Sequence, residues 1–269
     1  GNLNSCEILE QVWLAQLYLQ QQSTTSTSGD GGEVRNVVFM GMGEPLDNYR
    51  EVHEACRGFT HQCLFGFKSR HITLSTVGAS PYRIRSLARD APGISLALSL
   101  HGATDALREE LIPSARRNNK NIKKNQKSSL EDLGEALDYH ASCTQRGAMI
   151  EYLLIDGVND SHDAADALGR FCVERQTHND GGRGIGTYVN LIPYNPTLAG
   201  TNFGYGTPTN DRVESFCSRL RTNYGIRALV RWSSADGRDA NGACGQLALT
   251  TTATTPSSSS SLDSVMVAG

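Results

Sequence analysis

The stretch ISLALSLH, residues 94–101, decides the fold. Its first seven residues are apolar or small, and turn-forming residues flank it, with Pro92 and Gly93 before it and Gly102 after it. A short run of this kind is typical of a buried strand rather than of a helix. Because such a run leaves no polar face, we expect a parallel strand in a sheet that helices cover.

The same pattern recurs along the chain. Five more runs are expected to be strands: 36–40, 71–75, 149–155, 188–192 and 228–232. Helical periodicity is expected in six segments: 5–19, 49–64, 81–90, 129–146, 161–176 and 209–224. This alternation predicts an α/β fold, either an open doubly wound sheet or a full or partial barrel. Both architectures bind ligands at the carboxyl ends of their strands.

The composition is that of a soluble globular protein. The chain has 269 residues, a formal net charge of −3, 38% hydrophobic and 20% charged residues, which excludes a wholly disordered chain or a coiled coil. No run approaches the roughly 18 apolar residues of a membrane span, and the first residues do not resemble a signal peptide. The seven cysteines show no framework spacing, so we expect reduced thiols and a cytoplasmic protein, with plastid or mitochondrion as the alternative.

Three segments stand apart by composition. Residues 20–32 and 250–261 are rich in Ser, Thr, Gln or Gly and are expected to be flexible. The predicted organisation is one core over residues 1–249 and a disordered Ser/Thr-rich tail over 250–269. Residues 116–127 carry six basic side chains and no acidic one, which fits either a solvated loop or a contact with phosphates.

Polar residues follow the first two predicted strands. Gly41 and Gly43 allow close backbone approach, and Glu44 places a carboxylate suited to an ammonium group at the end of its strand. Ser75 and Thr76 offer hydroxyls at the end of the next strand. A simple turn with an exposed acid is the alternative interpretation of the glycine segment.

Further along the chain, three more strand ends carry candidate groups. Ser99 and His101 end the deciding stretch, and His101 is either a hydrogen-bonded structural group or a ligand-facing one. Asn195 lies between Tyr194 and a proline. Small residues flank Cys244 in a segment beyond the last strand, so its thiol is a candidate nucleophile, with a buried structural cysteine as the alternative.

Together these segments resemble the radical S-adenosylmethionine adenine methyltransferases of the RlmN/Cfr type. The resemblance rests on six motifs: GMGEPL at 41–46, LSTVG at 74–78, SLHGATD at 99–105, EYLLIDGVND at 151–160, NLIPYNP at 190–196 and ACGQLA at 243–248. It implies an α/β fold with a partial (β/α)6 barrel like a TIM barrel, here without its first strand and cluster loop. It also implies S-adenosylmethionine and a [4Fe–4S] cluster as cofactors.

The resemblance assigns roles to individual residues. Cys244 is implied to be catalytic, as the cysteine that first accepts a methyl group. The residues implied to bind S-adenosylmethionine are Gly43, Glu44, Ser75, Ser99, Leu100, His101 and Asn195. The implied reaction is radical methylation of an adenine carbon, with carbon 2 favoured over carbon 8, in large-subunit ribosomal RNA and in some members also transfer RNA. The implied partners are RNA and an electron donor, and we expect a monomer.

One departure from the family bears on this assignment. The family holds its cluster with a C-x3-C-x2-C run, and this sequence contains none; Cys6 stands alone, and six residues separate Cys56 from Cys63. The cluster ligands and the resolving cysteine are therefore expected to be absent from this chain, as in a fragment truncated at its N-terminus. The alternative is a cluster-less remnant that binds an adenosyl ligand or RNA without catalysis.

Overall fold

A computed structural model gives the fold. It describes the following residues: 1–25, 32–115, 129–176, 187–196, 200, 202–232 and the backbone of 264–267. The basic segment 116–127 lies outside these residues, and so do Cys244 and most of the Ser/Thr-rich segment.

The elements follow the order expected from the sequence. The helices are α1 (Ser5–Thr25), α2 (Tyr49–Thr60), α3 (Pro81–Asp90), α4 (Asp105–Leu111), α5 (Ser129–Thr144), α6 (His162–Gln176) and α8 (Asn210–Tyr224), with short 3-10 turns η1 (Ser69–His71) and η2 (Pro113–Ala115). The strands are β1 (Asn36–Phe39), β2 (Ile72–Thr76), β3 (Ser95–Ser99), β4 (Met149–Leu154), β5 (Tyr188–Pro193), β6 (Arg227–Val230) and β7 (Ser264–Val267). All six expected strands and all six expected helices are present, which confirms the α/β class; α4 and β7 were not expected.

The chain forms two compact units. Unit 1 comprises residues 1–75, 93–95 and 241–269, and unit 2 comprises residues 76–92 and 96–240. The sequence had suggested one core over residues 1–249.

Unit 1 is built on parallel strands. In the register of β1 with β2, Val37 lies opposite Ile72, and on its other side β1 pairs with β7, where Val37 lies opposite Val265. β7 lies in the segment that the sequence assigned to a disordered tail; its four residues, SVMV, are mostly β-branched or apolar and suit a strand. Helices α1 and α2 contact each other, and Phe59 of α2 packs edge-on against Phe39 of β1.

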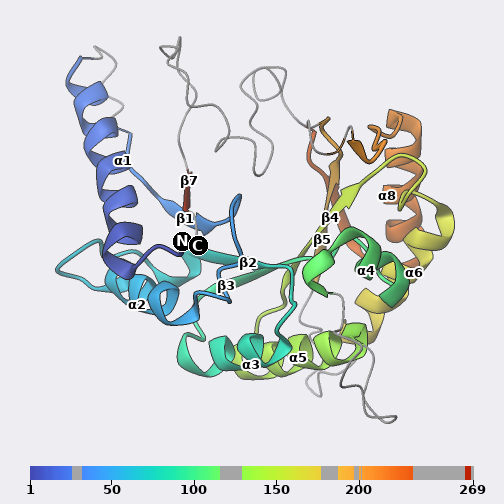
Figure 1. Cartoon of the computed structure of the whole chain (residues 1–269), viewed down its shortest axis with the longest axis horizontal. Coiled ribbons are helices and arrows are strands. Elements are labelled where there is room, and N and C mark those ends of the chain that lie inside the picture. The colour runs from blue at the N-terminus through green and yellow to red at the C-terminus, as the bar shows by residue number, and fades with distance from the viewer. Residues whose placement is uncertain are drawn as a thin grey trace. The chain divides into compact units, whose positions relative to one another are not determined.

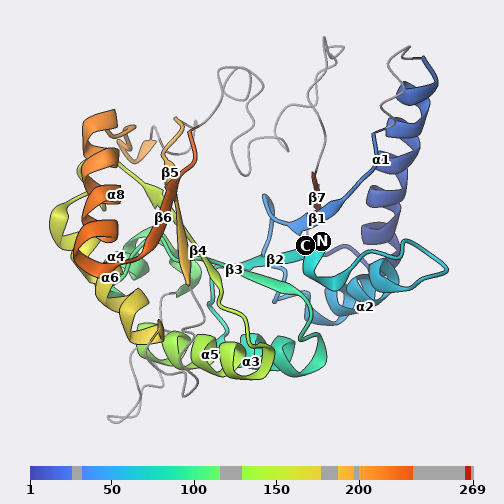
Figure 2. The same cartoon turned by 180° about the vertical axis from the view of Figure 1, so that it is seen from behind.

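In unit 2, strands β3, β4, β5 and β6 pair in parallel in that order. Helices α3, α5, α6 and α8 each contact the next and cover one face of these strands (Figures 1 and 2). The connection into α3 depends on Gly78, which has a φ of 68°. A Cβ on this glycine would lie 2.6 Å from Leu133 Cδ1 and 2.9 Å from Leu98 Cδ1, so only glycine lets this segment pack between the strand and α5.

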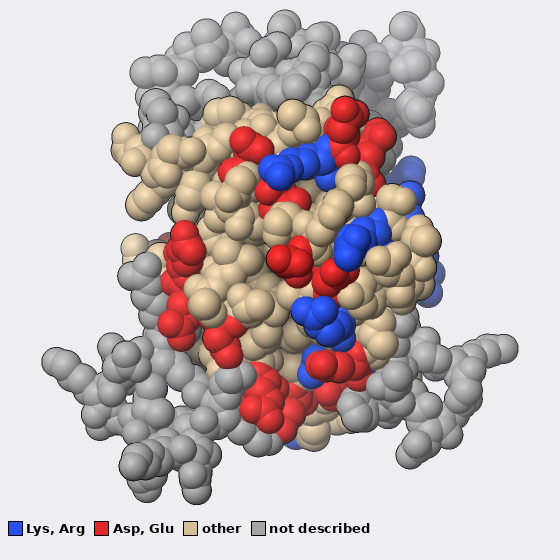
Figure 3. Space-filling view, turned by 90° about the vertical axis from the view of Figure 1, so that its right-hand side faces the viewer, with Lys and Arg blue, Asp and Glu red and all other residues tan. Residues whose placement is uncertain are grey.

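The outer, helical surface of unit 2 carries charges of both signs. Figure 3 shows acidic and basic side chains mixed on the face that it presents, without a large basic patch among the described residues. Arg219 of α8 binds Asp166 of α6 through two hydrogen bonds of 2.7 Å, and Arg212 lies 3.4 Å from Asp160. These pairs tie α8 to α6 and the segment before it. Within the described residues, no helix has the length and apolar character needed to cross a membrane.

We predict that His140 makes the fold sensitive to acid. Its side chain on α5 is buried, and burial, with the charge of Arg146, lowers its pKa from 6.5 to about 4. The unfolded chain therefore takes up a proton between pH 6.5 and 4 that the folded chain does not, so stability falls as the pH drops through this window. At pH 4.5 the loss attributable to His140 is about 2.5 kcal/mol.

Urea unfolding at pH 7 and pH 4.5, followed by circular dichroism, measures this effect. The variant His140→Leu should lose about 2.5 kcal/mol less than the wild type between the two pH values. The exposed His61 supplies the control, because His61→Gln should lose as much stability as the wild type. An equal acid loss in His140→Leu and wild type would contradict the assignment.

Candidate functional site

In unit 1, the expected ligand-binding residues lie together at the carboxyl ends of β1 and β2. The turn after β1 requires glycine, because Gly41 and Gly43 have φ values of 98° and 76°. Glu44 Oε1 accepts a hydrogen bond of 3.1 Å from the backbone N–H of Leu46, so the carboxylate is fixed by its own turn. Because Phe39 pairs with Leu74, the buried Ser75 at the end of β2 lies beside the start of this turn.

In unit 2, the chain turns sharply where β3 ends. Leu100 N–H donates to the carbonyl of Glu151 on β4, at 3.0 Å, and Leu100 O accepts from Gly102 N–H at 2.7 Å. Between them, His101 has a φ of 54°. This left-handed conformation is uncommon for a residue with a side chain and is found where surrounding contacts enforce it.

The contacts that enforce the turn also define the state of His101. Its Nδ1 accepts a hydrogen bond of 3.1 Å from the Leu153 N–H, and its carbonyl accepts one of 2.8 Å from Asn159 Nδ2. Since Nδ1 is an acceptor, this hydrogen-bond pattern assigns the ring proton to Nε2. Burial, together with the nearby charge of Arg108, lowers the pKa of His101 to about 4. His101 is therefore neutral at pH 7 and offers an N–H donor rather than a titrating base.

The side chain of Arg108, on α4, binds the backbone where β3 ends. Its side chain is 1% exposed, and its guanidinium donates to Leu100 O, at 3.2 Å, and to Val77 O, which follows β2. A buried arginine that binds two carbonyls fixes the spacing between Val77 and Leu100 within unit 2, because its planar donors have a rigid geometry. This role was not predicted, since α4 is a helix of only seven residues.

Asn195 follows β5, and the hydrogen bonds of Tyr194, the residue before it, fix the backbone there. Tyr194 N–H donates to Leu154 O at 2.8 Å, and Tyr194 O accepts from the Thr207 hydroxyl at 2.8 Å. The ring of Tyr194 packs edge-on against Tyr205, with centroids 6.1 Å apart. Asn195 is half-buried. In unit 2, the structure thus places Ser99, Leu100, His101 and Asn195 at one edge, with the end of β4 between β3 and β5.

Sequence reasoning missed a second layer of residues. Asn159 holds the end of β4 as well as His101: its Nδ2 donates to Leu153 O at 2.6 Å, and its Oδ1 accepts from Ile155 N–H at 2.7 Å. The signal was present in the sequence, because an Asn and an Asp follow a glycine turn directly after the strand. Glu151 and Asn190 were also missed, although each is a polar residue inside an otherwise apolar strand.

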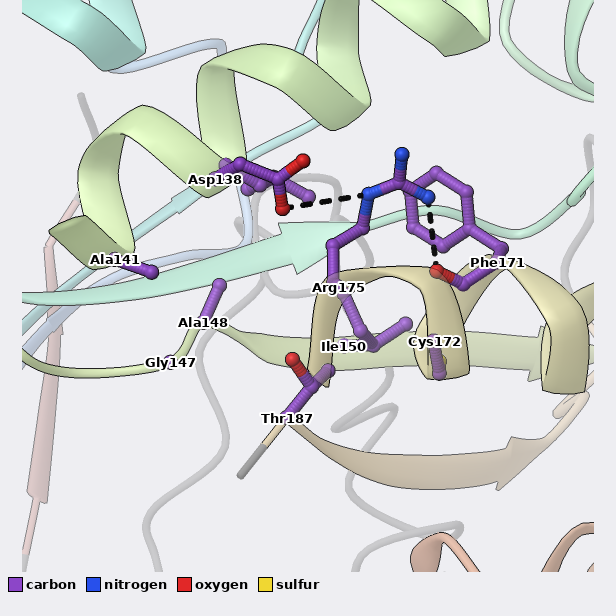
Figure 4. Close-up of a pocket in the computed structure, with 10 residues that line it drawn as sticks. Asp138, Ala141, Gly147, Ala148, Ile150, Phe171, Cys172, Arg175 and Thr187 are labelled. Atoms are coloured by element: carbon purple, nitrogen blue, oxygen red, sulfur yellow. Dashed lines mark hydrogen bonds and ion pairs between the residues drawn. The ribbon is translucent and has the colours of Figure 1, made fainter. Parts of the chain in front are cut away.

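A small cavity elsewhere in unit 2 does not belong to this site. It is lined by residues of α5, β4 and α6 and by Thr187, which directly precedes β5, as Figure 4 shows. Its volume is about 10 Å³, room for one water molecule. Arg175 binds Phe171 O at 2.9 Å, lies over the Phe171 ring and pairs with Asp138 at 3.6 Å. Arg175 therefore links α6 to α5 and has a structural role.

The described residues do not form a metal site. Nowhere in the part of the chain that the structure describes do three His, Cys, Asp or Glu side chains gather in a way that would hold a metal ion. Cys6, Cys63 and Cys143 are exposed, and three further thiols are buried: Cys56, Cys172 and Cys217. Burial raises the pKa of Cys56 and of Cys172 to about 12 and also raises that of Cys217, so these thiols are poor nucleophiles. Cys244 lies outside the described residues.

Comparison with known proteins gives a consistent result. The chain is 39% identical over 249 residues to a probable dual-specificity RNA methyltransferase RlmN of Mycolicibacterium vanbaalenii, covering 92% of this chain and 60% of that protein. A protein of the same description from Parafrankia sp. is 40% identical over 251 residues, covering 92% of this chain and 58% of that protein. The chain thus spans about three-fifths of the length of these curated relatives. No family model matches.

The fold has a solved counterpart. A crystal structure of a radical SAM methyltransferase from Sphaerobacter thermophilus matches with a TM-score of 0.73 and 35% sequence identity, covering 91% of this chain and 62% of that one. The match covers nearly the whole chain, so the solved structure supports the α/β fold for both units.

We predict that the charge of Arg108 keeps His101 neutral. Replacing Arg108 with Met removes that charge, so the pKa of His101 should rise above its value of about 4 while staying below 6.5, because burial remains its main cause. Arg108→Lys, which keeps the charge, is the matched control and should leave the pKa low. Titration of the histidine ring signals by NMR measures both variants. A His101 pKa that is the same in Arg108→Met as in the wild type would contradict the prediction.

Proposed function

Since this chain is a homologue of the RlmN proteins and has the fold of a radical SAM methyltransferase, we propose that it binds S-adenosylmethionine and serves RNA methylation. The observation that carries the proposal is 39–40% identity over 92% of the chain to two proteins described as RNA methyltransferases. The groups at the strand ends of each unit are chemically suited to such a ligand.

In unit 1, the glycine turn and Glu44 are proposed to bind the methionine part of the ligand. The two glycines leave the backbone open to close approach, and a carboxylate attracts the ammonium group of the amino acid. Ser75 supplies a hydroxyl beside this turn. In unit 2, Ser99, the Leu100–His101 turn and Asn195 are proposed as ligand-binding groups that offer neutral donors and acceptors, among them the Nε2–H of His101.

The chemistry of the proposed reaction also needs a [4Fe–4S] cluster, which supplies the electron for radical formation when it is bound. The described residues do not fit a cluster, because they bring no three cysteines together. No step through a cluster is therefore assigned to them. What they supply is the binding and orientation of the methyl donor.

We propose that Cys244 carries the methyl group. In the sequence, small residues flank Cys244, Ala243 before it and Gly245 after it, whereas burial raises the pKa values of Cys56, Cys172 and Cys217 and makes those thiols poor nucleophiles. The proposed acceptor is an adenine carbon, carbon 2, in large-subunit ribosomal RNA, with transfer RNA as a second substrate. The proposed partners are this RNA and an electron donor, acting on a monomer in the cytoplasm, or in a plastid or mitochondrion.

The missing cysteine run favours one alternative function. A chain that lacks C-x3-C-x2-C can bind an adenosyl ligand or RNA without transferring a methyl group. This alternative shares the ligand-binding step with the enzyme and differs from it in the chemistry at Cys244, so two separate experiments are needed.

The first experiment tests ligand binding. Equilibrium dialysis of the whole chain with labelled S-adenosylmethionine should show saturable binding, and Glu44→Gln should weaken it about tenfold, because a charge-assisted hydrogen bond is worth roughly 1.5–3 kcal/mol. Asp47→Asn is the matched control, since Asp47 is an exposed carboxylate in the same turn. Absence of saturable binding, or an equal loss in both variants, would refute the proposed site.

The second experiment separates the enzyme from the alternative. The chain is joined behind the cluster-bearing segment of an RlmN protein and incubated with S-adenosylmethionine, and its peptides are analysed by mass spectrometry. A methyl group is expected on Cys244 and to be lost in Cys244→Ala, while Cys63→Ala, which removes an exposed thiol, should leave it in place. A methyl group on another cysteine would show that the carrier is misassigned, and no methylated cysteine would favour the non-catalytic alternative.

A further inference from the structure

Three aromatic rings form a stack in the segment that follows β5. Tyr194 packs edge-on against Tyr205, with ring centroids 6.1 Å apart, and Tyr205 in turn lies nearly parallel to Phe203, at 24° and a centroid distance of 5.7 Å. We call these three residues the aromatic stack. Tyr194 is buried, Tyr205 is half-buried and Phe203 is 73% exposed. The aromatic stack therefore leads from the core of unit 2 to its surface.

Backbone hydrogen bonds fix the outer two rings of the aromatic stack. The N–H groups of Phe203 and Tyr205 both donate to the carbonyl of Gly200, at 3.0 and 3.1 Å. Gly204, between the two aromatic residues, has a φ of 70°, which glycine adopts without strain. This tight turn keeps the two rings in contact. A ring that is held in place before binding loses little conformational freedom when a ligand stacks on it.

The loop that carries the aromatic stack lies at the carboxyl ends of β4 and β5. Gly206 O accepts a hydrogen bond of 3.0 Å from the N–H of Asp156, which follows β4. The Thr207 hydroxyl donates to Tyr194 O, directly after β5. Asn195, which is proposed to bind the methyl donor, is the next residue along the chain. The exposed ring thus belongs to the edge of unit 2 where the methyl donor is proposed to bind.

The exposure of Phe203 gives this edge a flat apolar face. Its exposed fraction is the highest among the large hydrophobic side chains that the structure describes, ahead of Leu64 at 64%. A lone exposed apolar side chain is ordinary on a protein surface. The ring of Phe203 differs because a second ring holds it parallel at the edge of a proposed binding site. Phenylalanine has no polar side-chain atom, so it can recognise a ligand only by contact with its ring.

A nucleobase is the ligand that this face suits best. Every base has a flat π-face, and proteins that bind single-stranded RNA place unstacked bases on aromatic side chains. Arg212, whose partner Asp156 adjoins the loop, lies 3.8 Å from Asp156 and 3.4 Å from Asp160. Because these carboxylates neutralise its charge, the loop offers a phosphate little attraction. Binding here is therefore expected to depend on stacking.

We propose that Phe203 stacks on an unpaired base of the RNA substrate, with Tyr205 and Tyr194 supporting its ring. This proposal rests on the proposed function, since it takes RNA as the substrate. Stacking tolerates any base, so Phe203 adds affinity and fixes the position of the RNA beside the methyl donor without reading its sequence.

Fluorescence titration of the whole chain with a short oligouridylate that carries one 2-aminopurine tests the proposal, because stacking quenches this base. The wild type should bind the RNA and quench it. Phe203→Leu, which stays apolar but has no ring, should bind about tenfold more weakly, as loss of one stacked base predicts. Phe203→Tyr keeps a ring and should bind like the wild type. Tyr82→Leu removes an exposed ring from α3 and, as the matched control, should also keep the wild-type affinity.

Equal affinity and quenching in Phe203→Leu and the wild type would overturn this inference. Self-association of the wild type that Phe203→Leu abolishes, with RNA binding unchanged, would also overturn it and make the ring a contact between copies of the protein. Circular dichroism checks that the variants fold, and dialysis with S-adenosylmethionine measures the proposed ligand binding separately. A wild type that binds S-adenosylmethionine but not the RNA would refute the stacking role alone, whereas a wild type that binds neither would count against the proposed function as well.

Discussion

The buried guanidinium of Arg108 is the constraint on which the ligand-facing part of unit 2 depends. It binds Leu100 O, directly after β3, and Val77 O, in the segment that leads into α3, and so fixes the backbone on both sides of itself within unit 2. A charge in this position is costly to bury unless its donors are used, and here they are used by backbone carbonyls. The same charge acts on His101, so the residue that shapes the turn also contributes to the neutrality of its imidazole.

Neutrality at this edge has a chemical consequence. A histidine with a pKa of about 4 carries no charge at pH 7, and its Nδ1 is occupied by the Leu153 N–H. Its remaining function is to donate from Nε2, which suits recognition of a ligand and does not suit proton transfer. In the proposed function, this edge binds the methyl donor and transfers no proton. A fixed, uncharged hydrogen-bond donor suits that role.

Much of this arrangement was predictable because strands that helices cover must be apolar throughout. The run at 94–100 and five others were therefore predicted to be strands, and the polar residues at their ends predicted the candidate site. What could not be predicted depends on register. Glu151 and Asn190 are single polar residues within apolar strands, and only the pairing of β4 with β5 shows that they are neighbours. α4 was missed because seven residues are too few to show helical periodicity, and β7 because a long Ser/Thr-rich segment precedes it.

The central claim is that the carboxyl end of β3 and the residues around it hold an adenosyl ligand. A crystal structure of the chain with S-adenosylhomocysteine tests it most directly. We expect the ligand to lie within hydrogen-bond distance, about 3 Å, of the Ser99–Leu100–His101 turn and of Asn195. A ligand bound elsewhere on the chain, with this strand end untouched, would contradict it.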